Sequence, residues 1–148
     1  MSLLHQVALT YINKIGSVHA KTLVSYMGGA EKVFSASHAQ LLRAPGIGEK
    51  IISLLNFNEA LEKAKRELEF IEKNKIDVIF YTDARYPKRL KNCHDAPVLL
   101  YGKGNYDLNP PHVISIVGTR NATDYGRLLC KQLIEELQQY NVLIVSGL

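Results

Sequence analysis

The chain has 148 residues, of which 47% are hydrophobic and 22% charged, and its formal net charge is +4. This composition is typical of a globular protein with one domain or two small ones. Membrane and secreted classes are disfavoured, because no apolar run approaches the about 20 residues that span a bilayer and the first residues lack the features of a signal peptide. Cys93 and Cys130 have no metal-like spacing, so we expect free thiols, no metal site and a cytoplasmic location.

The first part of the chain has a helical pattern. Residues 1–58 carry few charges and place apolar side chains at helical spacing, with Ser35 and Ser37 as expected helix caps. Residues 59–73 show the clearest pattern, an apolar stripe flanked by acid-first pairs of opposite charge four residues apart. Residues 1–72 are therefore predicted to form a helical domain. The predicted helices are 4–15, 20–27, 30–35, 38–42, 49–55 and 59–73.

A turn with two glycines, at residues 45–48, resembles the helix–hairpin–helix motif. Gly46 and Gly48 allow a tight turn, so that backbone N–H groups of the next helix can face a phosphate, and Lys50 adds positive charge. A weaker copy aligns Gly16 with Gly46, thirty residues apart, and lacks the second glycine. We interpret the segment as a tandem helix–hairpin–helix (SAM-like) domain, whose intact copy either contacts DNA or serves as scaffold or protein-contact surface.

The pattern changes after residue 74. Short β-branched and aromatic runs bounded by prolines and glycines replace the helical spacing. Uninterrupted apolar runs on either side of a predicted helix, 125–140, fit parallel strands buried on both faces. Residues 73–148 are therefore predicted to be the N-terminal part of a Rossmann-like parallel sheet, which makes the fold α/β (α+β overall). The predicted strands are 77–81, 97–101, 112–117 and 142–145.

A basic run lies between the first two predicted strands. Residues 85–91 contain four cations and no acid. Arg85, Lys88 and Arg89 are therefore candidates for a contact with a polyanion such as DNA. A solvated basic loop without a ligand is the alternative interpretation.

Two glycine segments follow the third and fourth predicted strands. Because parallel neighbours bring their carboxyl ends to one edge of a sheet, Gly118 and Ser146-Gly147 are expected to lie side by side. Gly118 lets the backbone approach a ligand closely, and Arg120 can hold a phosphate through two hydrogen bonds. With Thr119 between them, these residues predict a phosphate site, although the spacing lacks the G-x-G-x-x-G pattern of a dinucleotide site.

The helix predicted after this loop strengthens the expectation. Its N-terminus offers free N–H groups and partial positive charge, which suit an anion. Thr123 or Asp124 is expected to cap it. Gly126 in its first turn is unfavourable unless something packs close there.

Four motifs follow one another through the second half of the chain. They are Tyr86-Pro87-x-x-Leu90, Asp95-x-Pro97-Val98-Leu99-Leu100-Tyr101-x-x-Gly104, Ile116-Val117-Gly118-Thr119-Arg120 with Tyr125-Gly126, and Val145-Ser146-Gly147-Leu148. In this order they resemble the bacterial DNA-processing protein A (DprA/Smf) family. The resemblance implies a protein that binds single-stranded DNA without strong sequence preference, protects incoming DNA during natural transformation and loads the RecA recombinase onto it. It implies no catalysis and no cofactor, and a homodimer for the full-length protein.

By this resemblance, Gly118, Thr119, Arg120, Ser146 and Gly147 line the DNA-phosphate pocket, with Arg120 as the principal contact. Because the chain ends at the second glycine motif, we expect the N-terminal part of a longer protein. A four-stranded half-sheet would then expose an apolar edge, which another copy or a rearrangement would cap. Two alternatives stay open: an enzyme or sensor that handles a nucleotide phosphate on the same scaffold, and a helical module devoted to protein interaction or dimerisation.

Overall fold

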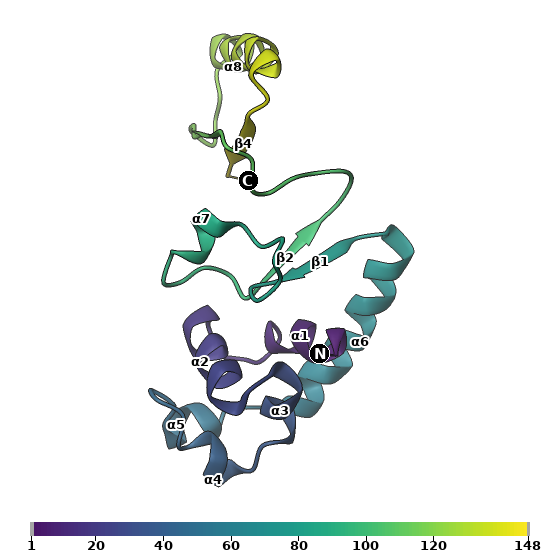
Figure 1. Ribbon diagram of the computed structural model, residues 1–148, viewed down its shortest axis with the longest axis vertical. Coiled ribbons are helices and arrows are strands. Elements are labelled where there is room, and N and C mark those ends of the chain that lie inside the picture. The colour runs from purple at the N-terminus through teal and green to yellow at the C-terminus, as the bar shows by residue number, and fades with distance from the viewer. Residues whose placement is uncertain (1, 148) are drawn as a thin grey trace. The chain divides into compact units, whose positions relative to one another are not determined.

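The computed structural model describes residues 2–147 and divides the chain into two compact units, Met1–Tyr106 (unit 1) and Asp107–Leu148 (unit 2) (Figure 1). Within the described residues, no helix combines the length and the hydropathy that a membrane crossing requires. Unit 1 contains α1 (Leu3–Leu9), α2 (Ser17–Met27), α3 (Ala30–Ser35), α4 (His38–Leu41), α5 (Glu49–Ile52), α6 (Phe57–Asn74), β1 (Asp77–Phe80), α7 (Lys88–Lys91) and β2 (Leu99–Gly102). Unit 2 contains β3 (Val113–Ile116), α8 (Asp124–Leu137), the 3-10 helix η1 (Gln138–Tyr140) and β4 (Leu143–Ser146).

The expected mixture of helices and strands is confirmed, with differences at helix ends. Helix α1 stops at Leu9, well before the predicted end at residue 15, because the chain turns there and Thr10 Oγ1 donates to the Val7 carbonyl (2.7 Å). Ser37 caps α4 as predicted: its hydroxyl accepts from Gln40 N (3.3 Å). Ser35 does not cap a helix; it is the last residue of α3. Helix α7, which lies in the basic run, was not predicted.

The core of unit 1 is helical but includes both of its strands. Helices α1 and α6 pack closely, and the buried side chains of α1, α2 and α3 join them in one apolar cluster. Phe80 from β1 and Leu99 from β2 belong to the same cluster. The β1–β2 hairpin therefore completes the helical core, so the compact unit extends to Tyr106, past the predicted boundary between residues 72 and 73. That boundary stays a prediction about domain organisation.

The two glycine turns of unit 1 correspond in a register that differs from the predicted one. Gly16 is the N-cap of α2 and Gly48 is the N-cap of α5, so these two glycines are equivalent, thirty-two residues apart. Two residues before each of them the backbone is left-handed, at Lys14 (φ 63°) and Gly46 (φ 73°). The predicted alignment of Gly16 with Gly46 is therefore wrong by two residues, because a lysine occupies the left-handed position in the first copy.

The hydrogen bonds of the two turns support this register. The N–H of Ile15 donates to the Ile12 carbonyl (3.3 Å), and the N–H of Ile47 donates to the Ala44 carbonyl (3.1 Å). Ile47 is buried, and Ile15 packs against the same core from a partly buried position. Each turn thus inserts an isoleucine between its two helices, as a repeated structural unit.

The predicted single parallel sheet is only partly present. Strands β3 and β4 pair in parallel, which confirms the parallel pair expected on either side of a helix. Strands β1 and β2 instead form a separate antiparallel pair, in which Asp77 is opposite Gly102 and Phe80 is opposite Leu99. The expectation of one four-stranded half-sheet is therefore wrong. An antiparallel pair needs only a chain reversal between its strands, and α7 with its flanking turns provides one.

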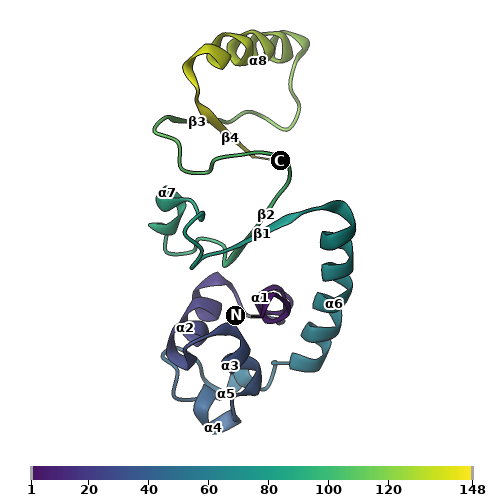
Figure 2. The same ribbon diagram turned by 45° about the vertical axis from the view of Figure 1, so that its right-hand side comes forward.

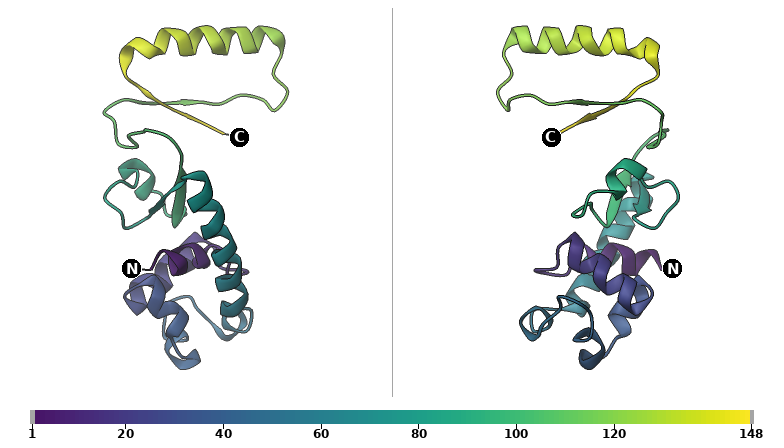
Figure 3. Two further views of the ribbon diagram at one scale, coloured as in Figure 1. Left: turned by 90° about the vertical axis from the view of Figure 1, so that its right-hand side faces the viewer. Right: turned by 60° about the vertical axis from the view of Figure 1, so that its left-hand side comes forward.

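Burial in unit 2 also differs from the prediction. Helix α8 lies along one face of the β3–β4 pair (Figure 3). Among the described residues 107–147, however, no hydrophobic side chain belongs to the buried core, and Val145 is 47% exposed. Strands buried on both faces, as predicted, are therefore not observed, since one helix and two strands have too little surface to cover each other.

The register of the repeat makes a prediction about stability. Gly46→Ala places a Cβ at a left-handed backbone position and should destabilise the protein by about 1–2 kcal/mol. The same substitution at Gly16, which has φ −83° and open space around its Cα, should cost less than about 1 kcal/mol, from the weaker N-cap alone. Urea unfolding followed by circular dichroism measures both values. Equal losses would instead favour the alignment of Gly16 with Gly46.

Candidate functional site

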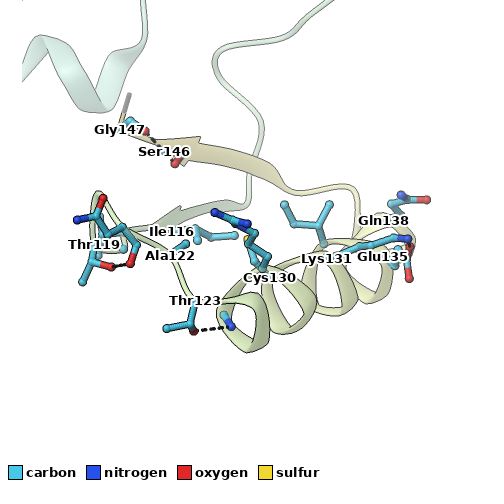
Figure 4. A pocket seen from close by; sticks show the side chains of 16 residues that line it. Ile116, Thr119, Ala122, Thr123, Cys130, Lys131, Glu135, Gln138, Ser146 and Gly147 are labelled. Atoms are coloured by element: carbon cyan, nitrogen blue, oxygen red, sulfur yellow. Dashed lines mark hydrogen bonds and ion pairs between the residues drawn. The ribbon is translucent and has the colours of Figure 1, made fainter.

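Strands β3 and β4 end side by side in unit 2. Ile116 pairs with Ser146 in the parallel register, so the loop after β3 and the segment after β4 leave the sheet at one edge (Figure 4). An added Cβ at Gly118 or Gly147 would meet no atom within 4 Å. The backbone at both glycines is therefore open to a ligand, as predicted. Leu148, the last residue of the motif, lies outside the described residues.

The loop after β3 is held by its own side chains. Thr119 Oγ1 donates to the Asn121 carbonyl (3.1 Å), and the loop then runs into the cap of α8. Arg120 lies at the tip of this loop and is exposed. Its guanidinium can reach an anion that approaches from solvent.

The N-terminus of α8 resolves the choice of cap. Thr123 Oγ1 accepts from Gly126 N (3.1 Å), whereas Asp124 in the first turn pairs with Arg127 (3.3 Å). The same hydroxyl accounts for Gly126, because a Cβ there would lie only 3.3 Å from Thr123 Oγ1. The absence of a side chain at Gly126 thus lets the capping hydroxyl approach closely. This is the close packing that the sequence analysis expected at Gly126.

The loop after β3, one face of α8 and Ser146-Gly147 enclose a hollow of about 870 Å³ (Figure 4). Gly118, Thr119, Ser146 and Gly147 line it together, so four of the five predicted pocket residues meet. Arg120 is not in this lining but follows Thr119 directly.

Two cations at this hollow were missed by the sequence analysis. Arg127 and Lys131 line it from α8, and Lys131 also lies 3.9 Å from the Glu135 carboxylate. The signal was available, because residues spaced four apart from the capping Thr123 share one face of a helix. Each of them is paired with a carboxylate of the same helix, Arg127 with Asp124 and Lys131 with Glu135, and Glu135 lines the hollow as well.

The basic run of unit 1 contains a cation that is already paired. Arg85 forms ion pairs with Asp83 (2.8 Å) and with Asp77, and the Asp77 carboxylate also accepts from the Tyr106 hydroxyl (2.9 Å). Hydrogen bonds from Arg85 hold the pKa of the Asp83 carboxyl below its ordinary value. Arg85 thus joins the turn after β1 to the start of β1, and its predicted contact with DNA stays a prediction.

The first two sequence motifs are joined by one buried side chain. Tyr86 is 2% exposed, and its hydroxyl donates to the Pro97 carbonyl (2.6 Å). This bond fixes the two ends of the segment that carries α7, so that Lys88 and Arg89 are presented on an exposed turn of helix. The role of the tyrosine in this structure is to position the basic run.

The glycine turn of the second repeat presents Gly46, Gly48 and Lys50 at the surface. Helix α5 after it has only four residues, so its dipole is small. Glu49 occupies its first turn and lies 3.1 Å from His38. A carboxylate in this position competes with a phosphate for the same N–H groups, and the contact of this turn with DNA stays a prediction.

Known proteins resemble the part of the chain that carries the four motifs. The sequence model of the family described as DNA recombination-mediator protein A matches residues 77–148. The DNA processing protein DprA of Bacillus subtilis (strain 168) is 37% identical over 87 residues, which are 58% of this chain and 29% of that protein. The DNA processing protein DprA of Streptococcus pneumoniae (strain ATCC BAA-255 / R6) is 39% identical over 66 residues, 45% of this chain and 23% of that protein. The matched segments thus span less than a third of these relatives.

The Arg85–Asp83 pair makes a prediction about pH. Because the pKa of folded Asp83 is lowered, the pair stabilises the protein above the unfolded pKa, near 4, and this stabilisation is lost as pH falls through the folded pKa. The stability difference between the wild type and Asp83→Asn should therefore be larger at pH 7 than at pH 3, as measured by urea unfolding. Arg85→Gln should show a pH dependence of the same sign, because it removes this pair together with the pair to Asp77. A difference that is constant with pH would contradict the assignment.

Proposed function

We propose that the protein serves DNA processing and recombination by binding single-stranded DNA, because residues 77–148 match the model of the DNA recombination-mediator protein A family. The proposed site is the edge where β3 and β4 end. The observation that carries the proposal is the register that pairs Ile116 with Ser146, since it brings two open glycine segments together. At such an edge a phosphate can approach the backbone closely, and Arg120 can hold it through two hydrogen bonds.

The surrounding groups suit a nucleic-acid backbone. The N-terminus of α8 directs N–H groups and partial positive charge towards the loop, and Arg127 and Lys131, each paired with a carboxylate of α8, line the same hollow. Contacts of this kind recognise phosphates and carry no base information, so the proposed binding tolerates any sequence. Gly118, Thr119, Arg120, Ser146 and Gly147 remain the proposed contact residues.

The proposal extends to the wider role of the family. We propose that the bound strand is incoming DNA in natural transformation, that it is protected there, and that it is passed to the RecA recombinase. A cytoplasmic homodimer is the proposed form of the whole protein. The match of residues 77–148 to the family model supports this wider role and the proposed homodimer.

Binding is proposed in preference to catalysis. Asp124, at the start of α8, is paired with Arg127 (3.3 Å), whereas Glu135 pairs with Lys131 (3.9 Å) near the other end of the helix, away from the strand ends (Figure 4). One carboxylate is paired and the other is distant, so neither is placed as a general base at the strand ends. The hollow of about 870 Å³ nevertheless lies within the range of small-molecule pockets, which favours a nucleotide as the ligand of the alternative enzyme or sensor.

The central residue of the proposed site can be tested directly. Arg120→Ala should weaken binding to single-stranded oligonucleotides of every sequence alike, by about tenfold or more, because a charged hydrogen bond to phosphate is lost. It should also reduce the slope of log affinity against log salt by about 1. Fluorescence anisotropy measures both quantities.

Arg66→Ala on α6 is the matched control, since it removes the same charge from an exposed position in the other unit. Binding that is unchanged in Arg120→Ala, or reduced equally in both variants, would remove Arg120 from the site. Displacement of the strand by a mononucleotide in the same assay would favour the enzyme or sensor alternative.

A further inference from the structure

Charge is distributed unevenly over unit 1. Residues 1–48 contain one acidic side chain, Glu31, whereas α6 contains five glutamates. Helices α2 and α7 lie on the side of unit 1 away from α6 in both views (Figures 1 and 2). On the side with α2 and α7, these two helices carry Lys21, Lys88, Arg89 and Lys91 and no acidic residue, whereas Lys14 lies beside Glu59 and Lys63 of α6. The cations of residues 1–48 and of α7 are Lys14, Lys21, Lys32, Arg43, Lys88, Arg89 and Lys91.

A groove of about 450 Å³ lies on this side, between α2 and the second glycine turn. Lys21, Thr22, Ser25 and Tyr26 of α2 line it, with Pro45 opposite them. Tyr26 is 49% exposed, so one large aromatic side chain is presented to solvent beside an ammonium group and hydroxyl groups. The folding of unit 1 does not account for this exposure, because the buried positions of α2 are Ala20, Leu23 and Val24.

The groove connects with the basic run. Lys21 Nζ donates to the His94 carbonyl (3.4 Å), and His94 lies three residues beyond the end of α7. An ammonium group has three donors, so this bond leaves two for another acceptor. Lys21 thus links the groove to the segment that follows the basic run, whose residues 85–91 contain no acidic side chain, although Asp95 comes directly after His94.

An exposed aromatic ring beside a run of cations suits a particular ligand. Proteins that bind single-stranded nucleic acid combine cations that follow the backbone with aromatic rings on which bases stack. A duplex has no free base face to offer, and an acidic peptide makes no use of the ring stacking. The combination of Tyr26 and Lys21 therefore favours single-stranded DNA.

We propose that unit 1 carries a second contact for single-stranded DNA, in which a base stacks on Tyr26 and the neighbouring phosphate pairs with Lys21. The ligand follows from the proposed function. The contact itself is independent of the Gly118 edge, by which we mean the edge where β3 and β4 end. It lengthens the strand that one chain engages, and the stacking adds affinity that does not depend on base identity.

The test uses the whole chain and anisotropy titrations with a thymidine oligonucleotide and with an abasic strand of equal length. Tyr26→Ala should weaken binding of the thymidine strand by about fivefold or more and leave the abasic strand unaffected, because only the former can stack. Tyr26→Phe should bind as the wild type does. Lys21→Gln should reduce the salt slope by about 1 on both strands. Phe70→Ala, which removes an exposed aromatic ring from α6, is the matched control and should change nothing.

The results separate this proposal from the first. Circular dichroism confirms that each variant is folded before it is titrated. If Tyr26→Ala binds the thymidine strand as the wild type does while Arg120→Ala is impaired, the second contact is overturned and the Gly118 edge stands. If Tyr26→Ala is impaired and Arg120→Ala is not, the second contact stands and the Gly118 edge falls. Equal losses on thymidine and abasic strands in Tyr26→Ala would overturn stacking, and a chain that binds no single strand would overturn both.

Discussion

The parallel pairing of β3 with β4 determines where every part of the candidate site lies. Residues 116 and 146 are far apart in the chain, and they become neighbours only because this register places them opposite each other. A slip of one residue would turn the side chains of a strand to the other face and displace the two glycine segments. The register is supported by few buried contacts, since no hydrophobic side chain of the described unit 2 reaches the buried core. Backbone hydrogen bonds and the cap of α8 therefore hold the edge together.

The four motifs that resemble the family lie in both units. In the first two, Tyr86 reaches the Pro97 carbonyl within unit 1, and Arg85, next to the first motif, joins two aspartates. In the third and fourth, a Cβ added at Gly118 or Gly147 would meet no atom of the described residues within 4 Å, whereas Gly126 packs against the Thr123 hydroxyl. Gly104 of the second motif is also open, so openness alone does not single out the strand ends. The physical reason for placing the ligand at the Gly118 edge is the parallel register, which brings two open glycine segments together.

Much of this arrangement could be predicted from the sequence, because it depends on local patterns. The periodicity of residues 59–73 predicts α6, and the order strand, glycine, helix, strand, glycine predicts that Gly118 and Gly147 share an edge. The direction in which β1 and β2 pair was harder to predict from the sequence. The apolar runs of β1 and β2 look alike in parallel and antiparallel sheets, and the connection of residues 81–98 is long enough for either; in the structure Tyr86 closes this connection onto Pro97 as a chain reversal.

Other features depend on backbone conformations that the residue types do not indicate. Lys14 adopts a left-handed conformation that is usual for glycine, so matching glycine with glycine gave the wrong register for the repeat. The cations Arg127 and Lys131 face the hollow only because Thr123 sets the phase of α8. Each miss therefore has a structural cause, and neither changes the position of the predicted edge.

The account rests on single-stranded DNA lying against the edge where β3 and β4 end. Ultraviolet cross-linking of a thymidine oligonucleotide to the whole chain, followed by peptide mass spectrometry, tests this most directly. The account predicts cross-links in the loop 117–123 and at Ser146 or Gly147. A strand that binds and cross-links elsewhere, with both of these segments unmodified, would contradict it.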